Sequence, residues 1–176
     1  MIGTIRSRTL TLVAVAAGAA LLGTAVPAQA DLGAPTRTDT RTVTRSPMPA
    51  PRLVDISTGR HTTFDRVVFK LRGDSPGYTV GYVRRVRADG SGNVVPLRGK
   101  ANLLVRLTPA DAHNSAGAPT YTGPRHIYPG YPQLREVAFV GDFEATVSIG
   151  LGLRHKAGFR VFTLHSPTRI VVDVAH

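Results

Sequence analysis

The sequence predicts an all-β domain, a single β-sandwich of about eight or nine short, mostly antiparallel strands. Three observations lead to this prediction. Apolar residues recur at every second position in several segments, turn-forming residues separate those segments, and no stretch after residue 30 has a helical apolar period. Strands are expected, in chain order, at residues 53–57, 65–72, 78–87, 93–96, 101–107, 135–140, 143–151, 159–165 and 169–175.

The first clear strand signal lies just after residue 64. Val67, Phe69 and Leu71 alternate there with Arg66 and Lys70. A period of two over this length is typical of a strand with one buried and one exposed face.

Two later segments repeat this signal. Residues 143–151 alternate almost without interruption, and residues 169–174 place Ile170, Val172 and Val174 on one face. Both segments are expected to bury one face of a sheet against the core.

Turn-forming residues support the same architecture. Residues 89–93 (DGSGN) are expected to be a hairpin loop, and Gly141-Asp142 a second turn before Phe143. The Gly-Ser-Gly at 90–92 lacks the Lys-Ser/Thr ending and the following helix of a phosphate-binding loop, so that alternative is disfavoured.

The first 30 residues read as an export signal. Arg6 and Arg8 precede a short apolar run at 10–22, and a small-x-small motif predicts cleavage after Ala30. The apolar run is shorter than the ~20 residues that span a bilayer, which disfavours a permanent membrane anchor. We therefore expect a secreted, extracellular protein without a stable membrane anchor in its mature form.

Residues 31–52 are expected to be a disordered linker rich in Pro, Thr and Arg, ahead of a domain at 53–176. The segment has four prolines and no aromatic ring, so it offers little apolar surface to offset the entropy of ordering. A spacer is favoured over a basic tether to anionic wall polymer.

Charge and cysteine content narrow the function. The chain has a net charge of +11, and residues 53–176 hold 16 basic and 9 acidic groups, a net +7. Such a surface attracts polyanions at low ionic strength. Arginine outnumbers lysine by 19 to 3, which together with abundant Ala, Gly, Val and Pro indicates a GC-rich coding sequence and weakens any functional reading of arginine.

The absence of cysteine excludes disulfides, thiolate zinc sites, a cysteine nucleophile and a lipid anchor on cysteine.

One long interruption of the strand pattern, residues 108–134, contains the candidate ligand-binding residues. Loops of this length are uncommon unless they are functional or disordered, and the three tyrosines argue against disorder. Two accounts are open: the rings stack on sugars beside basic groups, or they pin the loop over one end of the sandwich. The candidates are Tyr121, Arg125, His126, Tyr128 and Tyr131.

No catalytic or metal signature is present, so we expect neither an enzyme nor a cofactor. Glu136, Asp142 and Glu144 are close in sequence, but nothing indicates that they face one cleft, as glycoside hydrolysis requires. Serines lack the Gly-x-Ser-x-Gly elbow, and the histidines lack ligand spacing. A metal site assembled in space, for instance from His61, Asp65 and His176, has no support in the sequence.

Two pairs of charged residues lie inside otherwise apolar strands, Asp65-Arg66 and Arg169 with Asp173. Cross-strand ion pairing or an exposed sheet face explains them structurally, and a charged strip for recognition is the alternative.

In their order and spacing, several of these segments resemble the AMIN-like domain of exported actinobacterial proteins, over about residues 53–176. The segments are 64–69, 76–83, 141–144, 150–153 and 159–174. That group is similar to the AMIN domain that accompanies cell-wall amidases and type IV pilus secretins. The resemblance implies a non-catalytic β-sandwich that localises proteins to the envelope through peptidoglycan. It also marks six recurrent charged positions as candidates for a structural or recognition role, here Asp65, Arg66, Glu144, Arg160, Arg169 and Asp173. Many members carry a lipobox cysteine, which this chain lacks, and we expect no attached amidase domain.

Three functions follow as hypotheses. The first is a secreted, non-catalytic envelope module that binds peptidoglycan or an associated anionic wall polymer. The second is a protein-interaction subunit of an envelope assembly, and the third an unrecognised hydrolase. Because we expect the protein to be exported, we do not expect a specific nucleic-acid partner.

Overall fold

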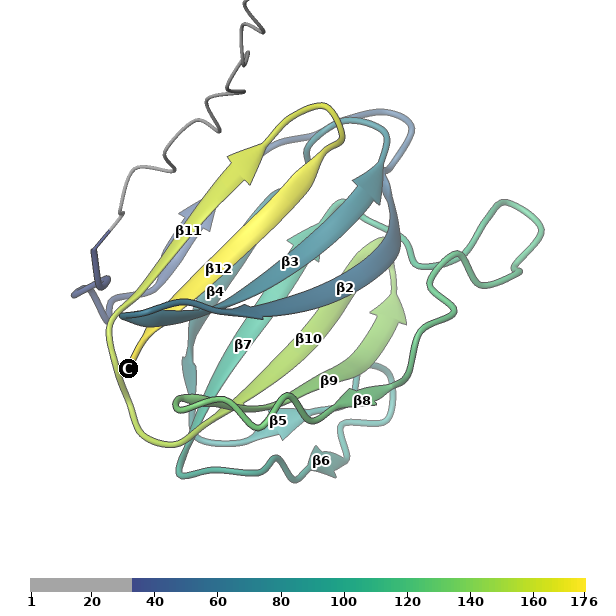
Figure 1. The fold of residues 1–176 in the computed structure, drawn as a ribbon. Helices are drawn as coiled ribbons and strands as arrows, with labels where there is room; N and C mark the ends of the chain where they lie inside the picture. Colours follow the sequence, from purple (N-terminus) through teal and green to yellow (C-terminus); the bar gives the residue numbers. More distant parts are fainter. Residues whose placement is uncertain (1–32) are drawn as a thin grey trace, which may run out of the picture. The chain divides into compact units, whose positions relative to one another are not determined.

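The computed structural model describes residues 33–176, and Figure 1 shows two layers of antiparallel strands. The larger sheet has the order β1-β4-β7-β10-β9-β8 and the smaller the order β11-β12-β3-β2, while β5 and β6 form a separate hairpin. No helix is present among the described residues, and therefore none there that could cross a membrane. The predicted all-β sandwich is confirmed, with more strands than expected. The predicted export signal lies outside the described residues.

The strand bounds differ from the expected ones mainly at their ends. The strands are β1 (Arg41–Val43), β2 (Arg52–Arg60), β3 (Phe64–Arg72), β4 (Gly77–Val83), β5 (Val86–Arg87), β6 (Val94–Val95), β7 (Ala101–Thr108), β8 (His126–Ile127), β9 (Leu134–Phe143), β10 (Thr146–Leu153), β11 (Phe159–Leu164) and β12 (Arg169–Ala175).

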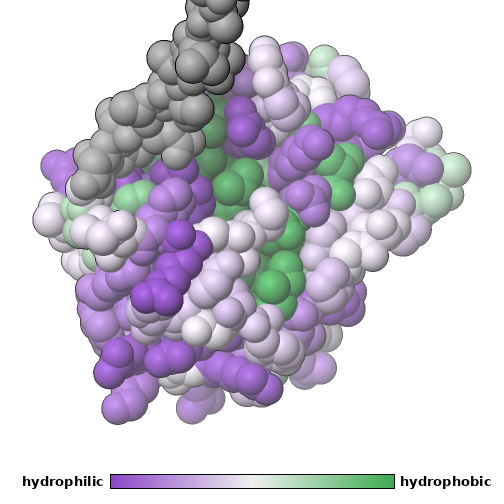
Figure 2. Space-filling view, in the orientation of Figure 1, coloured by the Kyte–Doolittle hydropathy of each residue, from purple (hydrophilic) through white to green (hydrophobic). Residues whose placement is uncertain are grey.

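The alternating apolar positions meet between the two sheets. Val67 and Phe69 of β3 are fully buried in the same core cluster as Val105 of β7 and Ile149 of β10. A smaller cluster around Val86 and Leu104 lies where the β5–β6 hairpin packs on the larger sheet. The outer face of the smaller sheet is mixed, and Figure 2 shows apolar patches there among polar side chains.

The expectation of a structureless linker is wrong for its described part, residues 33–52. Strand β1 pairs with β4, and the backbone N–H of Phe159 donates to the carbonyl of Arg37 at 2.7 Å. Pro35 and Pro51 are buried. The physical reason is that residues 36–46 contain no proline, so this extended stretch can supply backbone donors and acceptors to the edge of β4. Composition alone concealed this pairing.

Two local predictions were also wrong. The expected strand at 78–87 is interrupted at Arg84-Arg85 and becomes β4 and β5. Strand β9 continues through Gly141-Asp142, and the chain reverses at Glu144 and Ala145, whose φ angles are 50° and 53°. Two consecutive left-handed residues match the tight hairpin turn that fits sheet twist, here formed without glycine.

Candidate functional site

A basic pocket of about 400 Å³ opens at the end of the larger sheet where β7 and β9 begin and β10 ends. Four cationic side chains line it beside one exposed aromatic ring, and within residues 33–176 none of the four forms an ion pair with a carboxylate. The lining residues are Arg98, Gly99, Lys100, Tyr128, Gly130, Arg135 and Arg154. Four uncompensated cations around one hollow create a positive potential that favours an anionic ligand.

Backbone hydrogen bonds hold the segments that carry these cations. Lys100 donates its backbone N–H to the carbonyl of Leu153 at 2.8 Å, which ties the start of β7 to the end of β10. Arg154 donates its backbone N–H to the carbonyl of Gln133, also at 2.8 Å. Gly99 has a φ of +117°, and a Cβ there would overlap the Leu153 carbonyl oxygen. The close backbone approach therefore requires glycine at this position.

Glu136 is a buried residue of β9 whose carboxylate holds one of the pocket segments in place. Its Oε2 accepts the backbone N–H of Arg98 at 2.7 Å, and its Oε1 lies 2.7 Å from Nδ1 of His126. The side chain is 3% exposed, so these charge-assisted bonds lie away from solvent. One carboxylate thus connects the Arg98 loop to β8.

Tyr128 presents its ring to the pocket and to solvent. It is 51% exposed, the Cζ of Arg98 lies 4.0 Å from the ring centroid, and the ring of His126 stacks beside it with centroids 6.2 Å apart. An arginine over an aromatic face is a favourable cation–π arrangement. An exposed ring beside unpaired guanidinium groups can contact a sugar face while the cations bind phosphate or carboxylate oxygens.

The five predicted ligand-binding residues do not form one cluster. Tyr128 lines the basic pocket, and His126 stacks beside its ring without lining the pocket. Tyr121 is 8% exposed, donates its hydroxyl hydrogen to the Pro124 carbonyl at 2.8 Å and stacks on a neighbouring ring. Tyr131 packs against the main core. Arg125 lies with Tyr121 along a different pocket. The ring of Tyr128 is therefore placed for contact with a ligand, whereas the rings of Tyr121 and Tyr131 pin the loop to the sandwich.

The predicted charged residues divide between pairing and exposure. Asp173 is fully buried and binds both Arg66 and Arg160 across three strands. Asp65 is 1% exposed. Its Oδ2 accepts the backbone N–H groups of Gln133 and Leu134, and its Oδ1 lies 2.9 Å from Nε2 of His176. Glu144 is exposed in its turn and not on a strand face. Within the described residues, the side chain of Arg169 bonds only to the nearby Pro167 carbonyl. None of the six lines the basic pocket.

The three carboxylates considered for hydrolysis do not form a catalytic pair. Glu136 and Asp142 are six residues apart along β9, about 20 Å at the rise of a strand, and two-carboxylate glycosidases need separations of about 5–10 Å. Asp142 bonds to His113, and neither Glu136 nor Glu144 lines the pocket beside it. The suggested set of His61, Asp65 and His176 is not among the possible metal-ligand groups of the described residues.

The four pocket cations were missed from the sequence. They come from three segments that only the β7-β10-β9 strand order brings together. The closest signal was the Arg-Gly-Lys at 98–100, a glycine between two cations just before a strand, which the general excess of arginine concealed.

Comparison with known proteins agrees with this fold. The AMIN-like domain model matches residues 51–176. The chain belongs to the AMIN-like family. No curated protein and no solved structure matches it. AMIN-like domains are associated with proteins of the cell wall and envelope and are generally non-catalytic binding modules, so this chain is assigned to the envelope.

The segment that matches the family model starts inside the folded domain. It begins at Pro51, one residue before β2, and includes the whole basic pocket. Strand β1 lies outside the match yet completes the edge of the larger sheet. The AMIN-like sandwich of this protein thus includes a strand that precedes the family segment.

Proposed function

We propose that the protein is a secreted, non-catalytic envelope module that binds an anionic polymer of the cell wall in the basic pocket. The observation that carries the proposal is a group of four cations that pair with no carboxylate of residues 33–176 and surround the exposed ring of Tyr128. Binding proteins concentrate few but specific polar groups in a concave site, and the family's association with envelope binding modules supports that role here. The expected export signal at residues 1–30 supports a location outside the cytoplasm.

The ligand chemistry follows from the side chains. Arg98, Arg135 and Arg154 offer planar forks that match phosphate and carboxylate oxygens, and Lys100 adds a point charge. Tyr128 supplies a flat apolar face for a sugar ring. A polymer of sugars or polyols joined by phosphodiesters satisfies both features at once. Peptidoglycan, with carboxylates on its stem peptides, is the second source of the same chemistry.

Sedimentation with purified cell walls tests the proposal. We expect the protein to co-sediment at physiological salt, where charges separated by more than about 8 Å are screened. Removing the phosphodiester polymers from the walls should release it, and retention on the stripped walls would assign binding to peptidoglycan. Release by protease treatment of the walls would instead support the protein-interaction hypothesis and contradict the proposal, as would no retention at physiological salt.

A charge-matched pair of variants separates the pocket from the general positive charge. The double variant Arg98→Ala/Arg154→Ala should weaken binding by about tenfold for each charge-assisted hydrogen bond that it removes, at about 1.5 kcal/mol each. Arg60→Ala/Arg85→Ala removes the same charge from exposed positions outside the pocket. Equal weakening in the two variants would reduce the interaction to nonspecific attraction and overturn the assignment of the pocket.

A further inference from the structure

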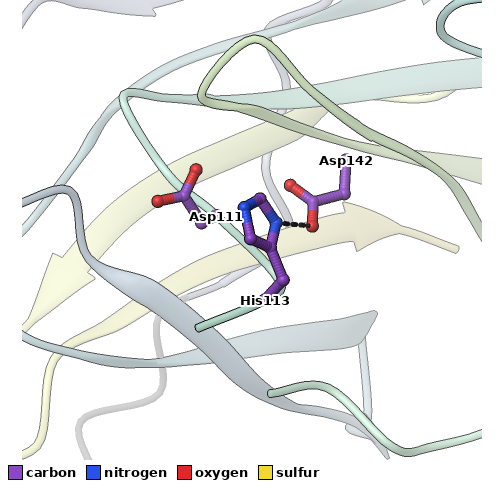
Figure 3. A group of neighbouring side chains, drawn as sticks. All are labelled: Asp111, His113 and Asp142. Carbon is purple, nitrogen blue, oxygen red and sulfur yellow. Dashed lines mark hydrogen bonds and ion pairs between the residues drawn. The ribbon is translucent and has the colours of Figure 1, made fainter. Parts of the chain in front are cut away.

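A second group of side chains lies at the opposite end of β9 from the basic pocket. Asp111, His113 and Asp142 each place one donor atom within 4.8 Å of the others. Figure 3 shows the His113 ring between the two carboxylates, with its Nδ1 bonded to Oδ2 of Asp142 at 2.6 Å. All three side chains are partly buried. The group is independent of the proposed polymer-binding site.

The backbone fixes the positions of these donors. Asp111 donates its N–H to the Pro51 carbonyl at 3.0 Å and accepts the N–H of Leu53 at 2.7 Å, so its backbone is bonded to the start of β2 on both sides. His113 follows two residues later and pairs with Pro119 in an isolated bridge. Asp142 is the penultimate residue of β9. With the backbone held in this way, binding an ion mainly requires that the His113–Asp142 hydrogen bond be replaced by bonds from both side chains to the metal.

The carboxylates are incompletely compensated. Oδ1 of Asp142 is shielded from solvent and accepts no hydrogen bond within residues 33–176, although a buried carboxylate oxygen without a partner is costly. Arg52 is close enough to act on the charge of His113, and Arg125 lines the same pocket, yet neither forms an ion pair with Asp111 or Asp142 in the described part of the chain. The orphaned oxygen is an observation separate from the clustering of the three residues.

From this geometry we infer that Asp111, His113 and Asp142 bind one divalent transition-metal ion. An imidazole nitrogen with two carboxylates suits Zn²⁺ and its neighbours in the first transition row. Ca²⁺, which takes six to eight oxygen ligands, is less well served by three residues of which one offers nitrogen. The two carboxylates balance the charge of the ion. A pocket of about 430 Å³ lined by His113 and Asp142 leaves room for water or a ligand at the open coordination position.

Calorimetric titration of the untagged, chelator-treated protein with Zn²⁺ tests the inference. We expect saturable binding of one ion per chain and a rise in the melting temperature. His113→Ala should weaken this binding by about 100-fold or more, because even partners outside the ligand set contribute 10–100-fold to metal affinity. The control His165→Ala removes an exposed histidine that is not one of the three donors, from the turn between β11 and β12, and should bind Zn²⁺ as the unmodified protein does. No saturable binding, or equal binding by both variants, overturns the inference.

A measurement on the unmodified protein covers the case in which His113→Ala does not fold. Substoichiometric Mn²⁺ broadens the NMR signals of nuclei near a bound ion. We expect the amide signals of residues 111–113 and 141–143 to broaden first. Broadening that is uniform over the surface, or that begins at other residues, contradicts the site.

Discussion

Arg66 and Asp173 face each other across the β3–β12 ladder and form a two-pronged ion pair. Arg66 Nε lies 2.6 Å from Asp173 Oδ1, and Nη2 lies 2.9 Å from Oδ2. Arg160 on β11 donates to the same Oδ2 at 2.7 Å. One fully buried carboxylate therefore connects three of the four strands of the smaller sheet.

Asp173→Asn should lower the free energy of unfolding by about 3 kcal/mol, because removing one partner of a buried ion pair leaves charge without compensation. The side chains of Arg66 and Arg160 are 19% and 24% exposed, so partial hydration keeps the effect near the lower end of the usual range. Denaturant-induced unfolding measures the change. A loss below about 1 kcal/mol would contradict a structural role for the carboxylate.

The matched control is Arg169→Ala on the same strand. Arg169 makes no ion pair in the described structure, only a long hydrogen bond of 3.3 Å to the Pro167 carbonyl. Its substitution should change stability by less than about 0.5 kcal/mol, because this half-buried side chain has no ion pair to lose. A large loss here would mean that the β12 charges act together, not through Asp173.

Glu136 supports the proposed binding site without lining the pocket. Glu136→Ala removes the acceptor for both the Arg98 N–H and the His126 ring, so we expect weaker wall binding together with reduced stability. Glu136→Gln retains one carbonyl acceptor and should recover part of the binding. Cell-wall sedimentation of the two variants, each checked for folding by circular dichroism, measures this order. Full wall binding by folded Glu136→Ala would refute the positioning role.

How far the sequence predicts this molecule depends on the range of the interaction. The buried positions Val67, Phe69, Ile170 and Val172 follow from period two, a local property of each strand. The sequence predicted the turn at Gly141-Asp142, because glycine is typical of turns. The chain reverses instead at Glu144-Ala145, and neither of these residue types indicates a left-handed conformation.

The basic pocket required information that no local pattern contains. Arg98, Arg135 and Arg154 become neighbours because β7, β10 and β9 are adjacent in the sheet, and strand order is a global property. Tyr128 was predicted because it lies in an aromatic loop, but its separation from Tyr121 was not. Whether a ring in a loop faces solvent or the core depends on the space beneath it, which only the assembled sheets define.

Burial of Tyr82 is expected to make the stability of the fold fall at alkaline pH. Its hydroxyl donates to the Ala157 carbonyl at 2.6 Å and accepts the Ala157 N–H at 2.9 Å, and burial raises its pKa. A folded-state pKa above the unfolded value of about 10 means that this stabilisation is complete below pH 10 and is lost as the pH rises through the folded pKa. The free energy of unfolding should therefore fall above about pH 10.

Tyr82→Phe should flatten that alkaline decline and cost about 1 kcal/mol at neutral pH, since two backbone groups of Ala157 lose their partner. Denaturant unfolding at a series of pH values measures both effects. Tyr128→Phe, whose hydroxyl has no hydrogen bond within residues 33–176, is the comparison and should leave the decline unchanged. An identical decline in Tyr82→Phe and the unmodified protein would show that other groups are responsible.

Gly99 tests whether backbone geometry at the pocket is required for binding. A Cβ at this position would overlap the Leu153 carbonyl oxygen, and the φ of +117° is itself strained for any other residue. Gly99→Ala should therefore lower the free energy of unfolding by about 2–4 kcal/mol and displace Arg98 and Lys100 from the pocket.

Gly90→Ala is the matched control, because Gly90 also has a positive φ of +77° but has no atom within 4 Å of the added Cβ. It should cost only about 1 kcal/mol and leave wall binding intact. Unfolding and sedimentation measurements on both variants distinguish strain from steric displacement, and equal behaviour of the two would show that the close approach to Leu153 does not shape the pocket.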